Sequence, residues 1–238
     1  MRIFLVRHGE SMGNVDKDIH RTMADHAISL SPKGVDQAQA AGLVLGDYLS
    51  GLGDVPVREH PGLRRPLRPR MWVSPYLRTR QTADGIESTI GMVDGPRGGN
   101  TDSRILDRRE HMLLVEQQFG LFDGLSDEEC AAQFPAENDH YLKQRRFQGR
   151  FWAPMPLGES RFQVAQRVHQ AFGTFHRDAE RHGIENIIVV SHGTTLRCFV
   201  MMWLHLPFEW IEKERNPKNC SIRLIDNSVD KGYIYEGG

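Results

Sequence analysis

Two runs of consecutive apolar residues stand out along the chain, at residues 3–6 and 187–190. A strand that is buried on both faces of a parallel sheet has this uninterrupted pattern, whereas a half-exposed strand alternates apolar and polar residues. A third, shorter run lies at residues 71–73. The pattern therefore predicts three strands that are buried inside a sheet.

Helical spacing of apolar residues predicts helices between these strands. Ser31 followed by Pro32 is a typical helix start, and Val35, Ala38, Leu45 and Leu49 then recur at helical spacing. Ser74 and Pro75 repeat the start signal, Ser126 begins a capping box, and Gly183 and Pro207 follow two further helical stretches. The expected helices span residues 32–51, 75–90, a short acidic segment after 126, 160–182 and 194–206.

Strands that alternate with helices of this length predict a three-layer α/β/α sandwich with a mainly parallel sheet. In such sheets the ligand lies at the carboxyl ends of the strands. Arg7-His8-Gly9 follows the first apolar run and Ser191-His192-Gly193 follows the second. We therefore expect the two histidines to meet at one edge of the sheet.

The chain has 238 residues, which favours a single domain over two. Two stretches interrupt the alternating pattern. Residues 55–70 contain four Pro and five Arg, and residues 91–100 contain four Gly and one Pro. We expect loop insertions near 51–70 and 91–104, without helices or strands.

Charge and composition exclude several classes of protein. Lys and Arg number 30 against 31 Asp and Glu, for a net charge of −1, so nothing attracts the chain to nucleic acid or an anionic membrane. The apolar stretch before Arg7 has only four residues, too short for a signal-peptide core, and we expect a cytoplasmic protein. Three cysteines without a CxxC spacing indicate neither a disulfide framework nor a thiolate metal site.

Candidate chemistry begins at the end of the first strand. His8 is delivered there on a rigid element, with the Arg7 guanidinium beside it, and a partly neutral imidazole can attack phosphorus. Ser11 and Asn14 can donate hydrogen bonds to phosphoryl oxygens. Such a histidine, taken alone, is more often structural than catalytic.

The motifs taken together are more specific. The segment LVRHGESMGN at residues 5–14 resembles the signature of the histidine phosphatase superfamily, which includes phosphoglycerate mutases and many phosphatases. Further blocks resemble this family in order along nearly the whole chain, at residues 74–83, 114–125, 158–160 and 189–197. The resemblance implies the phosphoglycerate mutase-like fold.

The resemblance also implies a role for each matching residue. His8 would be the nucleophile that forms a phosphohistidine, Arg7, Arg78 and His192 would surround the phosphoryl group, and Glu116 would protonate the leaving oxygen. Ser11, Asn14 and Gly193 would contact the substrate. Two guanidiniums and an imidazolium can stabilise the charge on the phosphoryl oxygens, so we expect neither a metal nor a cofactor.

Two positions have competitors. Glu110 also precedes apolar residues and competes with Glu116 for the role of the acid, and Arg80 competes with Arg78. The spacing to Phe119-Gly120 favours Glu116, and the offset from Ser74 favours Arg78. The other histidines have no metal-binding spacing, although His20 and His26 are candidates for a substrate contact, as is the Arg-rich stretch before residue 70.

We therefore expect a metal-independent phosphatase that hydrolyses small phosphomonoesters through a phosphohistidine on His8. One alternative is a mutase of the phosphoglycerate mutase type, although Arg145-Arg146 and residues 154–156 match the basic, proline-rich block of the mutases only loosely. A second is a non-catalytic protein that binds a phosphate ligand. The expected partner is a small phosphorylated metabolite, not nucleic acid or a membrane. The individual substrate and the oligomeric state are left open.

Overall fold

The computed structural model describes residues 1–52, 55–57, 60–65, 69–92 and 107–238. Its main sheet has six strands in the order β5-β4-β6-β1-β7-β8. Four neighbouring strands are parallel, and the last two run antiparallel to their neighbours. The strands are β1 (Arg2–Arg7), β4 (Arg70–Val73), β5 (Asp107–Glu110), β6 (Asn186–Ser191), β7 (Ile222–Asp226) and β8 (Val229–Tyr235).

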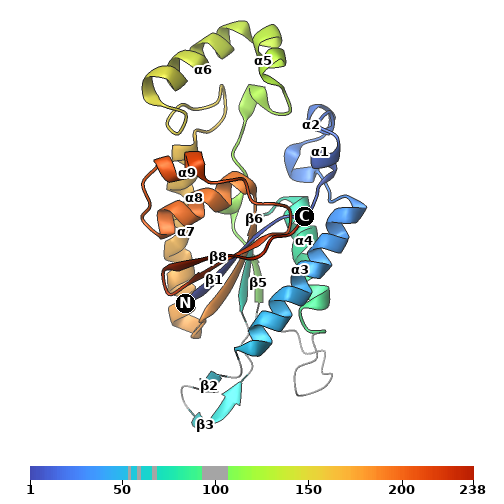
Figure 1. Cartoon of the computed structure of the whole chain (residues 1–238), viewed down its shortest axis with the longest axis vertical. Coiled ribbons are helices and arrows are strands. Elements are labelled where there is room, and N and C mark those ends of the chain that lie inside the picture. The colour runs from blue at the N-terminus through green and yellow to red at the C-terminus, as the bar shows by residue number, and fades with distance from the viewer. Residues whose placement is uncertain (53–54, 58–59, 66–68, 93–106) are drawn as a thin grey trace.

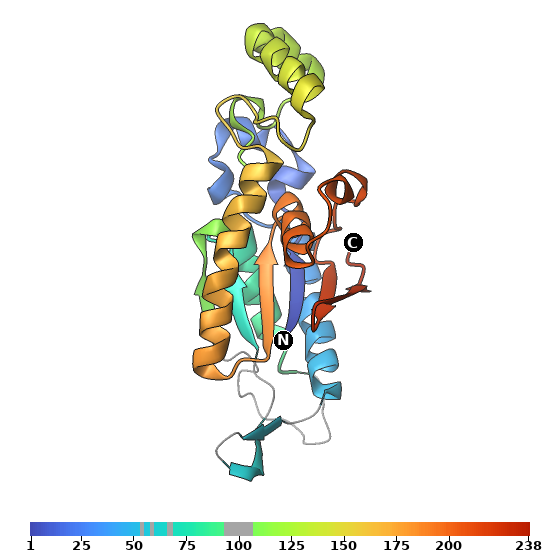
Figure 2. The same cartoon turned by 90° about the vertical axis from the view of Figure 1, so that its left-hand side faces the viewer.

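Two pairs of helices cover the two faces of this sheet, as Figures 1 and 2 show. On one face, α3 (Pro32–Gly51) and α4 (Leu77–Thr89) pack with Phe4 and Val6 of β1. On the other, α7 (Arg161–His182) and α8 (Gly193–Trp203) pack with Ile3 and Leu5. Because successive residues of a strand point to opposite faces, the apolar run supplies both cores. The predicted three-layer sandwich is confirmed.

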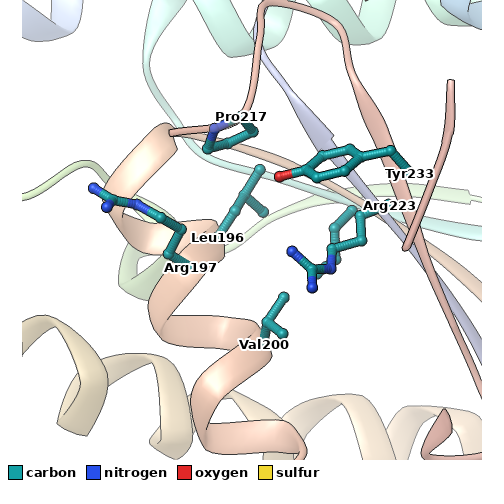
Figure 3. Close-up of a pocket in the computed structure, with 7 residues that line it drawn as sticks. Leu196, Arg197, Val200, Pro217, Arg223 and Tyr233 are labelled. Carbon is teal, nitrogen blue, oxygen red and sulfur yellow. The ribbon is translucent and has the colours of Figure 1, made fainter. Parts of the chain in front are cut away.

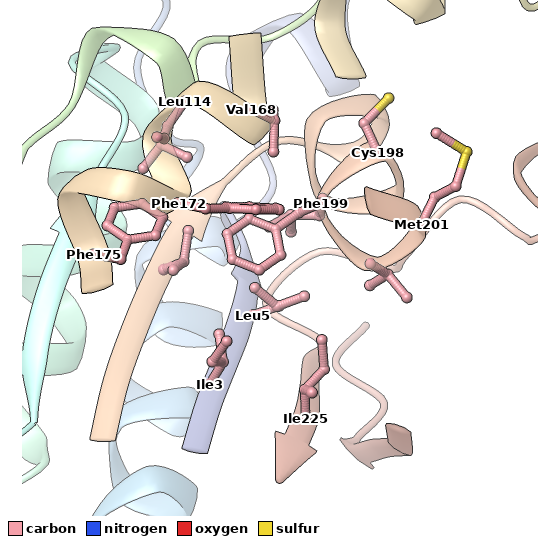
Figure 4. Close-up of a cluster of buried hydrophobic side chains, with 14 of the residues drawn as sticks. Ile3, Leu5, Leu114, Val168, Phe172, Phe175, Cys198, Phe199, Met201 and Ile225 are labelled. Carbon is pink, nitrogen blue, oxygen red and sulfur yellow. The ribbon is translucent and has the colours of Figure 1, made fainter. Parts of the chain in front are cut away.

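Aromatic rings fill much of the second core. Figure 4 shows Phe172, Phe175 and Phe199 gathered over the sheet beside Ile3 and Leu5. The rings of Phe172 and Phe199 have centroids 4.8 Å apart in an edge-on arrangement, a geometry that adds attraction beyond the area buried. This core holds α7 and α8 firmly against the strands that carry the candidate site.

The central strand β6 aligns the ends of its two neighbours. Arg7 of β1 pairs with Ser191, and Val73 of β4 pairs with Val190. The residues that follow these three strands therefore leave the sheet at one edge, as the sequence pattern predicted.

Several predicted helices have the expected boundaries. The Ser31 hydroxyl accepts a hydrogen bond from the backbone of Gly34 at the start of α3, and α5 (Asp127–Gln133) begins with a capping box on Ser126. The long helix α7 ends at Gly183, whose φ of 61° is the left-handed conformation typical of a glycine C-cap.

Other predicted boundaries were wrong. The helix expected from Pro75 begins at Leu77, because the Ser74 backbone still donates to the carbonyl of Val190 and extends the strand. The helix expected to reach residue 206 ends at Trp203. Val35 was placed on the buried stripe of α3, but it is 41% exposed.

The insertion at 51–70 was predicted without strands, and this was also wrong. It contains β2 (Val55–Val57) and β3 (His60–Arg65), which pair with each other in an antiparallel hairpin. Most of the second predicted insertion, from residue 93 to 104, lies outside the described residues.

The sequence pattern missed β5, β7, β8, α6 (Pro135–Gln148) and α9 (Glu209–Lys213). β5 has the sequence Asp-Arg-Arg-Glu at one edge of the sheet, and a polar edge strand has no apolar run to reveal it. α6 has only one buried residue, Tyr141, so its apolar stripe is almost absent.

The two ends of the sheet differ in what covers them. Figure 1 shows α1 (Met12–Val15), α2 (Ile19–Thr22), α5 and α6 beyond the carboxyl ends of the parallel strands, and the β2–β3 hairpin beyond the opposite ends. The β2–β3 hairpin therefore lies at the opposite end of the sheet from the edge where the histidines emerge. Within the described part of the chain, no helix is long and apolar enough to span a membrane.

Candidate active site

The sequence-predicted residues meet at the carboxyl edge of the parallel strands. His8 follows β1, His192 follows β6 and caps α8, and Arg78 lies in the first turn of α4. The imidazole rings of His8 and His192 have centroids 5.2 Å apart. His8, Arg78 and His192 are all buried, so their side chains form the floor of the site rather than its rim.

The His8 imidazole is held in one orientation. Its Nδ1 lies 2.7 Å from the carbonyl oxygen of Gly9, and because a carbonyl only accepts, Nδ1 carries the proton and Nε2 keeps its lone pair. Burial, and then the charges of Arg7 and Arg78, hold the pKa of His8 well below its usual 6.5. The imidazole is therefore neutral and nucleophilic at Nε2.

The packing of α3 explains why position 9 is a glycine. A side chain at this position would begin 2.4 Å from the carbonyl oxygen of Gly34 in α3. Glycine at position 9 therefore lets α3 pack directly on the turn after β1.

The two arginines are held by oxygens of neighbouring segments. Arg7 donates through Nη1 to the carbonyl of Pro217 at 2.6 Å, and burial lowers its pKa while the nearby Glu116 opposes that shift. Arg78 donates to Asp25, with Nη1 and Nη2 lying 2.9 and 3.1 Å from the two carboxylate oxygens. No motif in the sequence pointed to Asp25, which lies in the short 3-10 helix η1 (Asp25–Ala27).

The hydroxyl of Ser74, which follows β4, orients His192. Its Nε2 lies 2.8 Å from the hydroxyl of Ser74, while the buried Nδ1 has no hydrogen-bond partner among the described residues. Burial, and then the charges of Arg78, His8 and Arg7, hold its pKa well below 6.5. A neutral imidazole thus stands where the sequence analysis expected an imidazolium.

Glu116 lies against the amino end of α8. Its carboxylate oxygens accept from the backbone N–H groups of Thr194 and Thr195, at 3.3 and 3.2 Å. These are among the N–H groups that a helix leaves unpaired in its first turn. The arrangement places an ionisable carboxyl at the amino end of the helix that His192 caps, close enough to Arg7 to oppose the lowering of the Arg7 pKa.

A buried arginine of α7 holds the segment that carries Glu116. Arg167 donates to the carbonyls of Leu113, Val115 and Glu116, at 2.7, 2.8 and 3.0 Å. It also binds both carboxylate oxygens of Glu159, at 2.8 and 3.0 Å. Sequence analysis missed Arg167, although the Gly158-Glu159-Ser160 block that contains its partner was a signal.

Two of the three predicted substrate contacts, Ser11 and Asn14, lie in the segment after His8, and the third, Gly193, directly follows His192. The amide oxygen of Asn14 accepts from the backbone of Ser11 at 3.1 Å and from Asn219 at 3.2 Å. Asn219 also donates to the carbonyl of His8 at 3.1 Å, so these side chains brace the nucleophile's segment. Gly193 begins α8, and a side chain there would meet the amide of Asn216 at 2.2 Å.

The rival candidates Glu110 and Arg80 bind each other instead. Arg80 donates through Nε to the carboxylate of Glu110 at 2.7 Å, and both side chains are more than 40% exposed. This pair lies on the surface between β5 and α4, so neither residue takes part in the buried group of side chains. Among the described residues, no group of three His, Cys, Asp or Glu side chains could hold a metal ion.

A separate hollow lies between α8 and β7–β8 and is drawn in Figure 3. Its walls include Leu196, Val200 and Pro217. The cavity volume is about 10 Å³, which leaves room for roughly one water molecule. Because Arg223 at its edge is bound to Glu214 and Asp230, the hollow is a packing feature that offers no further binding site.

The sequence similarity to known proteins extends over nearly all of the chain. The chain is 33% identical over 232 residues to a phosphoglycerate mutase-like protein, AT74, of Arabidopsis thaliana, covering 94% of this chain and 64% of the relative. The chain thus spans slightly less than two thirds of that relative's length. It is 24% identical to the broad-range acid phosphatase DET1 of Saccharomyces cerevisiae, covering 96% of this chain and 86% of the relative.

Solved structures share the fold at lower identity. A mycobacterial glucosyl-3-phosphoglycerate phosphatase in complex with VO3 superposes with a TM-score of 0.66 at 21% identity, covering 100% of this chain and 99% of that one. The alpha-ribazole phosphatase of Shigella flexneri gives 0.65 at 19% identity, covering 100% and 96%. The sequence model of the histidine phosphatase superfamily (branch 1) matches residues 3–235. With this match and the phosphoglycerate mutase-like fold, the chain belongs to the histidine phosphatase superfamily.

Proposed function

We propose that this protein hydrolyses small phosphomonoesters through a phosphohistidine on His8, without a metal ion. The observation that carries the proposal is the orientation and the neutral charge of the His8 imidazole. Its Nδ1 proton is bound by the Gly9 carbonyl, and burial beside two arginines keeps the ring neutral. An imidazole in this state, at the floor of a cationic site, is suited to attack a phosphate ester.

In the first step, Nε2 of His8 attacks phosphorus and the bond from phosphorus to the ester oxygen breaks. Arg7 and Arg78 stabilise the equatorial oxygens. His192, whose ring lies beside that of His8, contributes a hydrogen bond from the ring nitrogen that carries its proton. Glu116 acts as the general acid and transfers a proton to the departing alcohol oxygen.

In the second step, water attacks the phosphohistidine. Glu116, now a carboxylate, takes a proton from the water as its oxygen bonds to phosphorus. The bond from phosphorus to Nε2 breaks, which restores His8 and releases inorganic phosphate. One carboxyl thus serves as acid and then as base, and the atoms and protons balance over the cycle.

Hydrolysis is favoured over phosphoryl transfer to a second alcohol by the position of the basic pair on α6. A mutase must grip its carboxylate-bearing acceptor while it excludes water. Arg145 and Arg146 are exposed in the last turn of α6, and Arg146 lies over the ring of Phe147. Among the hydrogen bonds and ion pairs of the described residues, none joins this pair to His8 or Arg78. The names of the relatives include both a mutase-like protein and an acid phosphatase.

The test is a comparison of wild type, His8→Ala and His140→Ala. His140 is an exposed histidine of α6, so its variant controls for loss of an imidazole. We expect wild type and His140→Ala to release phosphate from p-nitrophenyl phosphate over many turnovers in the presence of EDTA. His8→Ala should lose at least about 1000-fold in kcat, because the nucleophile itself is gone.

A labelled ester should also leave an acid-labile, alkali-stable phosphoryl adduct on His8 in wild type. Phosphate release by His8→Ala within tenfold of wild type would overturn the covalent mechanism. Isomerisation of 3-phosphoglycerate with little phosphate release would establish the mutase alternative. Binding of phosphate without turnover or adduct would establish the non-catalytic alternative.

A further inference from the structure

The Arg78 guanidinium is shared with a carboxylate that the proposed reaction does not use. Arg78 donates through Nη1 to both the backbone carbonyl and the carboxylate of Asp25, at 2.6 and 2.9 Å, and through Nη2 to the second carboxylate oxygen at 3.1 Å. A guanidinium has five N–H donors in a fixed fork, and Asp25 takes three of them. A phosphoryl group held by the remaining donors therefore lies next to the Asp25 carboxylate.

A second carboxylate lies close to the first. His20 of α2 bridges them, with Nδ1 3.6 Å from Asp25 and 3.8 Å from Asp123. Burial and the charge of Asp25 raise the pKa of Asp123, which is the response of a carboxyl that has a like charge beside it. Asp25 and Asp123 thus make one acidic wall next to Arg78.

This wall is fixed in place by close backbone packing around His20. A side chain at Gly13 would begin 2.5 Å from Nε2 of His20, and one at Gly124, whose φ is 71°, would begin 2.9 Å from its Cβ. His20 therefore fills the space between the segment after the nucleophile and the turn that carries Asp123. The acidic wall is a built part of the site and not a chance approach of surface side chains.

The charges near Arg78 decide which esters fit. The dianionic phosphoryl group is stabilised by Arg7, Arg78 and the donors of His192. A second anionic group on the same substrate would meet Asp25 and Asp123, and like charges placed together cost enough to change affinity by about tenfold or more. An uncharged hydroxylated group can donate hydrogen bonds to the same carboxylates, and a cationic group would be attracted to them.

We propose that Asp25, supported by Asp123, is a specificity-determining residue that selects phosphomonoesters of uncharged or cationic alcohols and rejects esters that carry a carboxylate. The inference rests on the proposed phosphatase function and names its substrate class. It also gives a physical reason for hydrolysis over mutase chemistry, because phosphoglycerates carry the carboxylate that this wall repels.

The experiment compares two esters that differ only at one end. Glycerol 3-phosphate and 3-phosphoglycerate share a three-carbon skeleton, and the first has an alcohol where the second has a carboxylate. Phosphocholine serves as the cationic ester. We expect wild type to have a kcat/KM for glycerol 3-phosphate and for phosphocholine at least about tenfold above that for 3-phosphoglycerate.

Asp25→Asn should lower the ratio of kcat/KM for glycerol 3-phosphate to that for 3-phosphoglycerate by about tenfold, mainly through a lower KM for 3-phosphoglycerate. The ratio is the readout because any disturbance of Arg78 affects both esters alike. Asp123→Asn should move the ratio in the same direction by less, and it also serves if Asp25→Asn does not fold. Asp18→Asn is the matched control, because Asp18 lies in the same segment and is 75% exposed.

A wild-type ratio near one, or a ratio that Asp25→Asn and Asp123→Asn leave unchanged, would overturn the inference while the phosphatase activity stands. Absence of phosphate release from every ester, together with absence of a phosphohistidine, would overturn the proposed function itself. The two failures are therefore distinguishable in one set of assays.

Discussion

The hydroxyl of Ser74 lies 2.8 Å from Nε2 of His192, although the two residues are 118 positions apart in the chain. Ser74 leaves β4 and His192 leaves β6, its immediate neighbour in the sheet. Both groups are completely buried, so this contact fixes the ring without competition from water. Ser74 is therefore a positioning residue for the histidine that faces the phosphoryl group.

Replacing Ser74 with Ala should lower kcat for p-nitrophenyl phosphate by about 5- to 10-fold, the equivalent of one buried hydrogen bond. KM should change less, since the ring's orientation matters most as charge develops in the transition state. Ser88→Ala is the control, because Ser88 is an exposed residue near the end of α4 whose hydroxyl donates to the Gly85 carbonyl of its own helix. Equal rates in the two variants, with unchanged thermal unfolding, would show that His192 does not depend on Ser74.

The loss of rate on esters with different leaving groups distinguishes Glu116 from Glu110 as the general acid. Glu116→Gln should reduce kcat by about 100-fold or more for alkyl esters such as glycerol 3-phosphate, which need a proton on the departing oxygen. The loss should be much smaller for p-nitrophenyl phosphate. Glu110→Gln should leave both rates near wild type, because Glu110 pairs with Arg80 at the surface. A selective loss in Glu110→Gln would mean that the wrong carboxyl was assigned.

Contiguous motifs explain why the side chains named from the sequence lie together in the structure. Arg7 and His8 end a buried strand, and His192 ends its neighbour, so the apolar runs that predict the sheet also bring these side chains to one edge. Arg78 and Glu116 lie in blocks that the family resemblance identifies by spacing. The end of an apolar run and the spacing within a motif are both patterns of a few neighbouring residues. Such short-range patterns can be recognised in a single sequence.

The residues that escaped prediction depend on long-range contacts. Asp25 lies in a segment without periodicity and meets Arg78 at a separation of 53 residues. Arg167 lies beside the apolar stripe of α7 and resembles a solvent-facing residue in sequence, yet its side chain is only 12% exposed because three backbone carbonyls and Glu159 surround it. Neither contact leaves a local signal in the sequence.

A buried ion pair between the sheet and α7 should dominate the stability of this side of the fold. Arg70 of β4 donates through Nη1 to both carboxylate oxygens of Asp178, at 2.9 and 2.7 Å, and both side chains are less than 10% exposed. Arg70→Ala should lower the free energy of unfolding by about 3 kcal/mol, because it leaves a cavity and a buried Asp178 whose remaining partners are Arg109 and the more distant His182.

The control for this change uses the same carboxylate. Arg109 also binds Asp178, at 3.0 Å, but its side chain is 40% exposed, so Arg109→Ala should cost less than about 1 kcal/mol. Urea unfolding of the two variants measures the difference. Equal losses would mean that burial does not set the value of the Arg70 contact.

The two site histidines should make stability depend on pH below 6.5. Burial and the neighbouring arginines hold the pKa values of His8 and His192 well below 6.5 in the folded protein. In the unfolded chain both imidazoles regain a pKa near 6.5. Between these values the unfolded state binds more protons, so the free energy of unfolding falls as the pH is lowered through this range.

The expected loss is at most about 1.4 kcal/mol per pH unit for each histidine. Urea unfolding of wild type at pH 7.5, 6.5 and 5.5 should show it, and His192→Asn should show a shallower dependence. His140→Asn should match wild type, because it removes an exposed imidazole. Carboxylates that titrate at lower pH are common to all three proteins, so the difference between variants isolates the buried ring. If His192→Asn retained the full wild-type dependence, protonation of His192 would not oppose folding, and the neutral state assigned to it would be wrong.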